Sequence, residues 1–321
     1  VLAGGPALNG VIQLVKRHLA LDEARLRERA EEAAQRDEDD DGDDDAPDDE
    51  QEAELLTSCA ALTIELVRQH GEAALPQVEA QLLPHMQAWL VGAAVEEEGQ
   101  IVRLALGLDV VSGLIEHCGQ AAAKKYVAAV LPLLQAHVGA TDARLRRSAF
   151  RGMGVVIEHG GKLLSRPAAT QVAERLVSVL SAPDARYSNN VGASEAAAAA
   201  LGRLLVHRAP SVDAPSVLPL WLRWLPLRHS ADDAPIAMTC LCQLLEVDAA
   251  AVFGPQHGAF PQVLGALAAA YEHEDTTAPV SARMRSLVSG WSTANRGLLE
   301  AGTAALPAQY MRDKVVRMVA A

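Results

Sequence analysis

The stretch at residues 142–161 reads DARLRRSAFRGMGVVIEHGG. Asp142 is a residue type preferred at helix N-caps, because its side chain accepts hydrogen bonds from the unpaired backbone N–H groups of the first turn. Leu145 and Ala149 open a row of small and apolar residues at helical spacing. The run ends at Gly160, and glycine adopts without steric penalty the left-handed conformation that closes many helices. The stretch therefore predicts one helix with a defined start, an apolar face and a defined end.

This helix belongs to a repeat. Its end, Val156–Gly161 (VIEHGG), matches Leu114–Gly119 (LIEHCG). Candidate units, each with two apolar-periodic helices, open at steps of 47, 45, 47 and 46 residues near Ala74, Ala121, Arg166, Asp213 and Ala259. A two-helix repeat of this size is typical of HEAT and armadillo proteins. Because one helix pair cannot bury its apolar face alone, such units stack, and the sequence predicts an all-α, HEAT-repeat right-handed superhelical solenoid.

The composition argues against several protein classes. Half of the residues are hydrophobic but only 3% are aromatic, which suits helices that approach closely. No uninterrupted apolar run approaches the roughly 18 residues of a membrane span, and no secretory signal peptide is visible. Four cysteines without a disulfide-dense pattern indicate a reducing compartment. The chain starts at Val1 inside what reads as a helical array, so we expect it to be the C-terminal part of a longer array.

Most of the net charge lies in one segment. The formal net charge is −13, and residues 37–50 contain 11 acidic side chains and no basic one, so the rest of the chain sums to −2. The acidic residues are Asp37, Glu38, Asp39, Asp40, Asp41, Asp43, Asp44, Asp45, Asp48, Asp49 and Glu50. Blocks of like charge repel one another and stay disordered. We therefore expect partial-repeat helices at 1–36, an acidic disordered insert at 37–50 and a HEAT-repeat solenoid of about five to six helix pairs at 51–321.

Three interpretations of the insert stay open. It is a solvated linker, a loop that attracts basic proteins, or a calcium site. The calcium interpretation rests on Asp37, Asp39, Asp41 and Gly42, which match the first half of an EF-hand loop. The last position of such a loop would be Asp48 instead of the usual bidentate Glu, and any run of aspartates produces such a match. We therefore expect no bound metal.

Other candidate chemistry is sparse. Cys240 and Cys242 stand two positions apart in a helical stretch, so their thiols point to different faces and cannot easily share one metal. The run at 272–275 offers metal-ligand types without a second cluster to join it. The sequence has no G-x-S-x-G, P-loop or G-x-G-x-x-G motif, and the arginines at 144–151 are too few for a nucleic-acid footprint. We expect no catalytic, cofactor-binding or metal-binding residue, and neither a nucleic-acid nor a membrane partner.

Two tryptophans stand three positions apart. Trp221 and Trp224 lie in LPLWLRWLPL, residues 218–227, and an i, i+3 pair shares one helix face. The pair either fills the joint between neighbouring units or forms a partner-facing aromatic patch, so both residues remain candidates for partner binding, together with the acidic side chains of the insert. Upstream, a polar stretch at 188–195 runs into an alanine-rich helix, where Asn190 is placed either to cap the helix or to bridge backbone groups between repeats.

At these positions the sequence resembles the importin-β (karyopherin-β) family of nuclear transport receptors, in its C-terminal third. The resemblance rests on the tryptophan motif at 218–227, on Asn190-Val191-x-Ala193-Ser194-Glu195, on Ile115–Cys118, on Gly254-Pro255 and on the acidic insert ahead of 55–67. It covers essentially the whole chain. The tryptophan motif is specific, whereas the HEAT pattern alone is not. The sequence departs from the family at Ala196, where an asparagine is expected.

The resemblance implies a receptor that carries basic cargo, such as ribosomal proteins and histones, between cytoplasm and nucleus through the nuclear pore. It also implies that the full-length receptor binds Ran-GTP to release cargo and touches phenylalanine-glycine nucleoporins during transit. This chain is then expected to offer an acidic loop to basic partners. One alternative is another HEAT scaffold, such as a phosphatase regulatory subunit. A more remote one is a HEAT-type enzyme, such as a helical-repeat DNA glycosylase or a bilin lyase.

Overall fold

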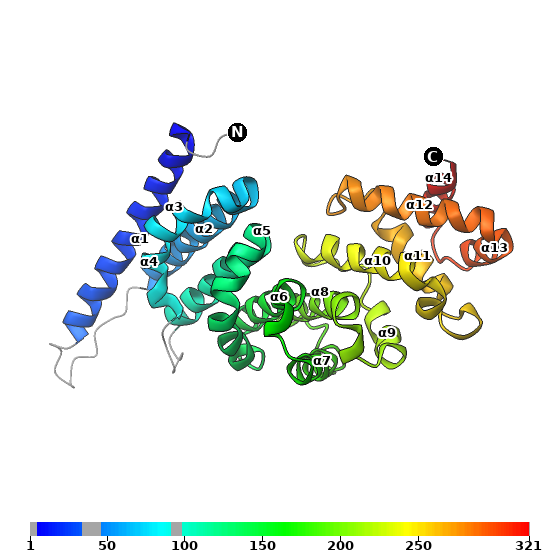
Figure 1. Cartoon of the computed structure of the whole chain (residues 1–321), viewed down its shortest axis with the longest axis horizontal. Coiled ribbons are helices and arrows are strands. Elements are labelled where there is room, and N and C mark those ends of the chain that lie inside the picture. Colours follow the sequence, from blue (N-terminus) through cyan, green and yellow to red (C-terminus); the bar gives the residue numbers. More distant parts are fainter. Residues whose placement is uncertain (1–4, 34–45, 91–97, 321) are drawn as a thin grey trace. The chain divides into compact units, whose positions relative to one another are not determined.

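The computed structural model describes residues 5–33, 46–90 and 98–320 of the 321-residue chain. These residues form fourteen α-helices joined by loops and short 3₁₀ turns, and they contain no β-strand (Figure 1). The prediction of an all-α HEAT-repeat solenoid fold is confirmed. The chain divides into two compact units, Val1–Leu163 and Leu164–Ala321.

The first unit is built around three long helices. Its helices are α1 (Pro6–Ala33), α2 (Ala46–His70), α3 (Leu75–Gln81), α4 (Leu83–Met86), α5 (Glu98–His137) and α6 (Ala143–His159), with 3₁₀ turns at Gly71–Ala73, Gln87–Leu90 and Gly161–Leu163. Helix α2 packs against α1 and α5, and α5 packs against α6. In α1, Leu8, Ile12, Val15 and Leu19 recur at helical spacing and are at most 5% exposed, so one apolar stripe of the helix faces the core.

Glycines with positive φ end helices at the predicted places. Helix α5 is two helices joined at Gly119, where φ is 56° and ψ is −137°. At the matching end of α6 the positive φ of 52° falls on Gly161, whereas Gly160 has a φ of −69°. The Gly160 N–H instead closes the last turn by donating to the Val156 carbonyl at 2.8 Å. The glycine stop is confirmed in both repeats, one residue later than expected in α6.

Helix α2 begins inside the segment that was expected to be disordered. Its first residue is Ala46, while residues 37–45 lie outside the described residues, and 46–50 are described in their backbone alone. Pro47 stands in the first turn of α2, where its fixed φ suits a helix and its missing N–H removes no hydrogen bond. Helix α2 therefore starts five residues before residue 51, and the domain boundaries at 36, 37, 50 and 51 stay a prediction.

The second unit continues the helix pairs. Its helices are α7 (Arg166–Leu180), α8 (Val191–His207), α9 (Ala214–Leu222), α10 (Asp233–Phe253), α11 (Phe260–Ala270), α12 (Ala278–Ala294), α13 (Arg296–Ala304) and α14 (Gln309–Ala320), with 3₁₀ turns at Ala209–Ser211 and Pro255–His257. Arg166 opens α7, and Asp213 and Ala259 are the N-cap residues of α9 and α11. These are three of the predicted unit starts, so the sequence pitch corresponds to real helix pairs.

Helix α10 lies among other helices of the second unit. It packs against α8, α11 and α12, and Ala237, Leu241 and Cys242 are fully buried. Of the described residues, this helix alone is long and apolar enough to cross a membrane by length and composition. Its packing accounts for the apolar residues on the faces that α8, α11 and α12 cover.

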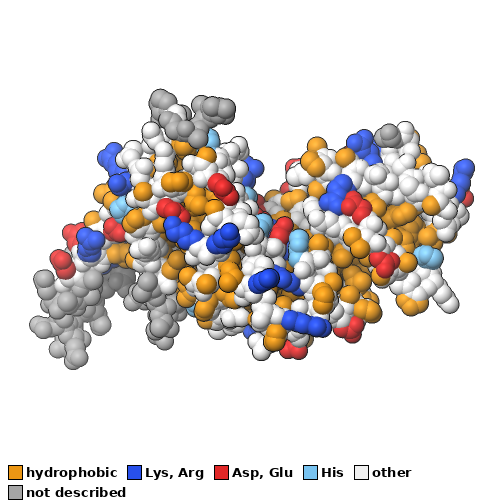
Figure 2. Space-filling view, in the orientation of Figure 1, with side chains coloured by type: hydrophobic (Ala, Val, Ile, Leu, Met, Phe, Trp, Pro, Cys, Tyr) orange, Lys and Arg blue, Asp and Glu red, His pale blue; other side chains and the backbone are white. Residues whose placement is uncertain are grey.

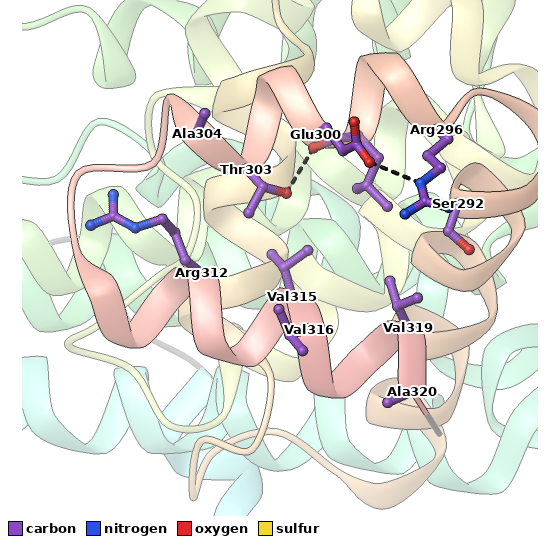
Figure 3. Close-up of a pocket in the computed structure, with 11 residues that line it drawn as sticks. Ser292, Arg296, Glu300, Thr303, Ala304, Arg312, Val315, Val316, Val319 and Ala320 are labelled. Carbon is purple, nitrogen blue, oxygen red and sulfur yellow. Dashed lines mark hydrogen bonds and ion pairs between the residues drawn. The ribbon is translucent and has the colours of Figure 1, made fainter.

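The last three helices leave an open groove. Helix α12 packs against both α13 and α14. A groove of 630 Å³ lies between α13 and α14, with Ser292 of α12 at one end (Figure 3). Apart from that serine, its lining residues come from the two short helices.

Candidate partner-binding surfaces

The tryptophan motif spans the end of α9 and the turn that follows. Trp221 is 0% exposed, and its indole Nε1 donates to the Ala198 carbonyl of α8 at 2.8 Å. Trp224 is 5% exposed, and its Nε1 donates to the Leu180 carbonyl at the end of α7 at 3.3 Å. The two rings therefore hold α9 and its following turn to both helices of the preceding pair.

Neighbouring residues close this joint around the rings. Gly202 of α8 has no room for a Cβ, which would stand 2.8 Å from the Trp221 ring. The Arg186 guanidinium lies 4.0 Å from the centre of the Trp224 ring, within the range of a cation–π contact. The structure thus places both tryptophans in the joint between repeats, the first of the two interpretations. Neither ring lies on the surface, as a partner-facing patch requires.

A buried carboxylate fixes the loop directly after the motif. Glu195 of α8 is 3% exposed, and its Oε1 and Oε2 accept hydrogen bonds from the backbone N–H groups of Arg228 and His229, each at 2.8 Å. Hydrogen bonds to an ionised acceptor are roughly twice as strong as neutral ones. Sequence reasoning assigned no role to Glu195, and the one signal that pointed to it was its place in the family-like stretch at 190–195.

Asn190 does not cap α8, and its bridging contact lies within one loop and not between repeats. It occupies the N-cap position of α8 but makes no side-chain capping bond. Its Nδ2 instead donates to the carbonyl oxygen and to the carboxylate of Asp184, at 3.3 and 3.0 Å. Asn190 therefore ties together the loop that precedes α8.

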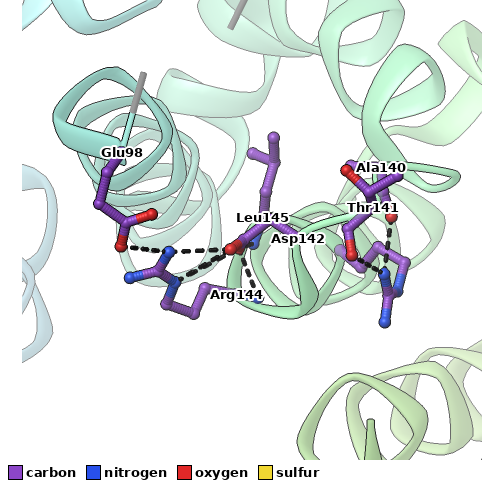
Figure 4. Close-up of polar contacts among 7 residues, drawn as sticks. Glu98, Ala140, Thr141, Asp142, Arg144 and Leu145 are labelled. Carbon is purple, nitrogen blue, oxygen red and sulfur yellow. Dashed lines mark hydrogen bonds and ion pairs between the residues drawn. The ribbon is translucent and has the colours of Figure 1, made fainter. Parts of the chain in front are cut away.

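Asp142 caps α6 as the sequence predicts. Its Oδ1 accepts hydrogen bonds from the backbone N–H groups of Arg144 and Leu145 at 2.9 and 3.0 Å (Figure 4). The Arg144 guanidinium lies 2.8 Å from Asp142 and 2.7 Å from Glu98 of α5. Burial raises the pKa of Asp142, but the hydrogen bonds from Arg144 and Leu145 outweigh it, so this pKa lies below its ordinary value of 3.8.

We expect Asp142→Ala to lower the free energy of unfolding by about 1 kcal/mol near neutral pH, because two N–H groups of α6 lose their acceptor. Since the folded pKa of Asp142 is depressed, its stabilisation is present above the unfolded pKa and disappears as the pH falls through the folded one. Urea unfolding of both proteins at a series of pH values measures this.

The matched control is Asp142→Asn, which keeps an acceptor that caps helices well. It should retain most of the stability near neutral pH and lose the acid dependence. Equal unfolding of Asp142→Ala and the unchanged protein at neutral pH would show that the cap contributes nothing.

The arginines of α6 serve local structure. Arg144 is held between two carboxylates, and Arg146 donates to the carbonyls of Ala140 and Thr141 at 2.7 and 2.6 Å. Arg146 thus fastens the turn between α5 and α6, and Arg144 ties the start of α6 to the start of α5, so two of the four arginines at 144–151 have a structural role.

The acidic candidates cannot be located among the described side chains. Asp37, Glu38, Asp39, Asp40, Asp41, Asp43, Asp44 and Asp45 lie outside the described residues, and of Asp48, Asp49 and Glu50 the backbone alone is described. Their role in partner binding, the calcium interpretation included, remains a prediction. Over the described surface in Figure 2, basic and acidic side chains are intermixed, in keeping with the nearly neutral charge outside residues 37–50.

A buried ion cluster joins the two helices that flank the acidic segment. The Arg103 Nη2 of α5 lies 2.5 Å from Asp22 Oδ1 of α1 and 3.3 Å from Glu52 Oε1 of α2, and the three side chains are 10%, 4% and 6% exposed. Arg29 of α1 lies 3.2 Å from the other oxygen of Glu52. The cluster thus fastens the end of α1 and the start of α2 to α5.

The pKa of the Glu52 carboxyl is shifted by its place in this cluster. Burial, and next the hydrogen bond with Asp22, raise its pKa above the ordinary value of 4.5, against the attraction of Arg103 and Arg29. A raised carboxyl pKa means that stability is lost as the pH rises through it and is regained in acid. The cluster holds the three helices together through its ion pairs. The buried carboxylates of Asp22 and Glu52 are stabilised by the guanidinium groups of Arg103 and Arg29.

The cysteines and the acidic run at 272–275 show no metal chemistry. In the part of the chain that the structure describes, no three His, Cys, Asp or Glu side chains come together to hold a metal ion. Cys240 and Cys242 are buried, and burial raises the pKa of the Cys242 thiol to about 12. Glu272 pairs with Arg317 of α14 at 2.9 Å, so it fastens helices to one another.

Two comparisons give the family context. Residues 6–92 match the family model for importin repeat 6. The chain is also similar in structure to the karyopherin Kap121p bound to the SUMO protease Ulp1p, with a TM-score of 0.68 over 96% of this chain and 26% of that chain at 18% identity. The resemblance to the importin-β family is confirmed. Within this karyopherin family, the sequence resembles the C-terminal third of importin five.

Further karyopherin structures agree. Kap121p bound to Ste12p gives a TM-score of 0.65 over 95% of this chain and 25% of that chain at 17% identity. Kap121p bound to RanGTP gives 0.58 over 85% of this chain and 24% of that chain at 18% identity. This chain therefore spans about a quarter of the length of the karyopherins that it matches. At this identity the likeness establishes the fold, and Ulp1p, Ste12p and RanGTP are partners of Kap121p.

Proposed function

We propose that this chain is the C-terminal HEAT-repeat segment of a nuclear import receptor of the importin-β type. In the full-length receptor it contributes to the binding of basic cargo, such as ribosomal proteins and histones, and to its carriage through the nuclear pore. The full-length receptor shuttles between cytoplasm and nucleus, contacts phenylalanine-glycine nucleoporins and releases cargo when Ran-GTP binds. The segment works by binding alone, with no catalytic step.

The observation that carries this proposal is the coincidence of two matches on one chain. An importin repeat covers residues 6–92, and a karyopherin fold covers 96% of the chain. A phosphatase regulatory subunit would share the stacked helix pairs but not the importin repeat. A helical-repeat DNA glycosylase would need a basic groove for its substrate, whereas this chain carries a net charge of −13.

The charge distribution supports basic proteins as cargo. The segment at 37–50 holds 11 carboxylates, and the remainder of the chain is close to neutral. Such a concentration of one sign attracts partners of the opposite sign over a distance and speeds their association. The buried cluster of Asp22, Glu52 and Arg103 holds α1 and α2, the two helices between which most of this segment lies in the sequence, against α5.

We expect replacement of the 11 acidic residues of 37–50 by Ser or Asn to remove most of the salt-sensitive binding of purified core histones. The change takes the net charge from −13 to −2 and leaves the buried residues of the helices in place. For the unchanged chain, the affinity should fall steeply as salt shortens the Debye length from about 10 Å at 0.1 M to about 3 Å at 1 M. Calorimetric titrations at several salt concentrations measure both effects.

The matched control is a chain in which the same residues of 37–50 are shuffled. It keeps all 11 charges and should bind histones as the unchanged chain does, because attraction by a charged block depends little on residue order. Undiminished binding by the neutralised chain would show that the segment is a linker and that cargo is held elsewhere. Circular dichroism should give the same helix content for all three proteins.

A further inference from the structure

The groove between α13 and α14 has an apolar middle and polar ends. Leu299 and Val315 form a buried floor, at 6% and 2% exposed. Val316 and Val319 rise from α14 beside it and are 61% and 36% exposed. Figure 3 shows these valines between the two helices, with Arg312 at one end of the groove and Arg296 at the other. Exposed aliphatic side chains gathered beside a concave apolar floor are typical of a protein-docking site.

The charge around the groove has the opposite sign to that of the whole chain. Residues 278–320 carry six Lys or Arg and two Asp or Glu, a net charge of +4 in a chain of net charge −13. Some of these cations are paired with carboxylates, as Arg296 is with Glu300 and Arg317 with Glu272. Arg312 instead donates to the Leu306 carbonyl at 2.5 Å and to Gln309 Oε1 at 3.0 Å, both neutral acceptors. The nearby Asp313 carboxylate accepts from Gln309 at 2.8 Å, and no described ion pair joins it to Arg312. The end of the groove at Arg312 therefore presents a partly compensated positive charge.

We propose that this groove docks an amphipathic helix of a partner protein, with an aliphatic face and with carboxylates toward Arg312. The partner helix would carry its aliphatic side chains at positions i, i+3, i+4 and i+7, the spacing of helix-in-groove recognition. These side chains would contact Leu299, Val315, Val316 and Val319. The walls are helices of 9 and 12 residues, so about three turns of a partner helix, at 1.5 Å per residue, match their length.

Two other occupants fit less well. A second copy of this chain, if it met the groove with the same face, would bring two grooves together that each hold Arg296, Arg312 and a single carboxylate, Glu300, and the excess of like charge opposes such a contact. The acidic segment of this chain, residues 37–50, has the right charge but contains no Leu, Ile, Val, Met or aromatic residue. It has no apolar face to fill an apolar groove. The partner that fits supplies both aliphatic and acidic side chains.

The test uses the full chain and three labelled peptides of about 16 residues, the length of roughly four helical turns. The first peptide has Leu at the i, i+3, i+4 and i+7 positions and Glu elsewhere. The second replaces each Glu with Lys, and the third has the composition of the first in an order that spreads the Leu residues around the helix. In fluorescence anisotropy, the first peptide should bind about tenfold more tightly than either of the others, because binding needs both one apolar face and negative charge.

Protein variants locate the binding. Val316→Asp should weaken the first peptide about tenfold or more, since it puts a carboxylate in the middle of the contact. Val247→Asp, on α10 outside the groove and 87% exposed, is the matched control and should change nothing. Arg312→Gln should weaken binding of the first peptide and should not change binding of a peptide with Gln in place of each Glu. Because Arg312 also donates to the Leu306 carbonyl, the melting temperature of this variant is measured as a check on its fold.

Three results would overturn the proposal. One is equal binding of the acidic and lysine peptides, which would remove the charge selectivity. Another is undiminished binding by Val316→Asp, which would place the contact elsewhere. The third is concentration-dependent dimerisation in sedimentation runs that Val316→Asp abolishes, which would make a second copy of the chain the occupant. None of these results bears on histone binding by residues 37–50, so the failure of one proposal is distinguishable from the failure of the other.

Discussion

Trp221→Ala is expected to lower the free energy of unfolding of the second unit by about 3–5 kcal/mol, the range for truncating a buried aromatic side chain. The ring is 0% exposed, and its indole hydrogen bond to Ala198 would be lost with it. Gly202 lies against the ring and has no side chain with which to fill the space. Urea unfolding followed by the fluorescence of Trp224 and Trp291, both in the second unit, measures the change.

Tyr187→Ala is the matched control for this truncation. Tyr187 stands in the loop before α8 and is 63% exposed, so its removal should change the free energy of unfolding by less than about 0.5 kcal/mol. A Trp221→Ala protein that unfolds normally but no longer binds histones would contradict the structure and return the tryptophans to the surface as partner contacts.

Arg103→Ala is expected to destabilise the first unit by about 3–5 kcal/mol, because removing one partner of a buried ion pair leaves the other charges uncompensated. Asp22 and Glu52 would then face each other at 4% and 6% side-chain exposure without the guanidinium that now lies 2.5 and 3.3 Å away. Unfolding monitored by the fluorescence of Trp89, the tryptophan of the first unit, gives the free energy.

The pH dependence separates this charge effect from lost packing. The folded pKa of Glu52 is already raised by burial and by Asp22, and Arg103 lowers it. Loss of Arg103 raises it further, so the extra destabilisation should be largest near pH 7 and should shrink in acid as the Glu52 carboxyl takes up a proton. Arg27→Ala, which removes a 78% exposed side chain 3.9 Å from Glu23, should cost less than about 0.5 kcal/mol at neutral or acid pH. If the free energy of unfolding of Arg103→Ala differed from that of the unchanged protein by the same amount at every pH, the destabilisation would come from lost packing and not from charge.

The helix pairs could be predicted because the information that specifies them is local. Asp142 lies beside the N–H groups that it caps, and Gly119 ends the helix that precedes it. The apolar stripe of α1 repeats within single turns. Helix start and stop signals and the period of apolar residues extend over a few neighbouring positions, so a single sequence is enough to recognise them.

The features that could not be predicted join distant positions. Arg103 and Asp22 are 81 residues apart, and Glu195 accepts from residues 33 and 34 positions further along. A single sequence shows that Glu195 stands in an alanine-rich helix but not which backbone its oxygens will meet. The groove beside Val316 was missed for a similar reason, because an apolar residue on a helix reads as core until the neighbouring helices are placed.

The seam at Gly119 restricts how the length of this chain can change in evolution. There one helix runs into the next without a loop, so an inserted residue would turn everything after it by about 100° and advance it by about 1.5 Å. Val127, Val130 and Leu134, at most 3% exposed, would then leave the core together. The loop between α7 and α8 has residues enough to absorb such a change. We therefore expect insertions and deletions in the loop between the two helices of a pair, as between α7 and α8, and not at the seam where one unit runs into the next.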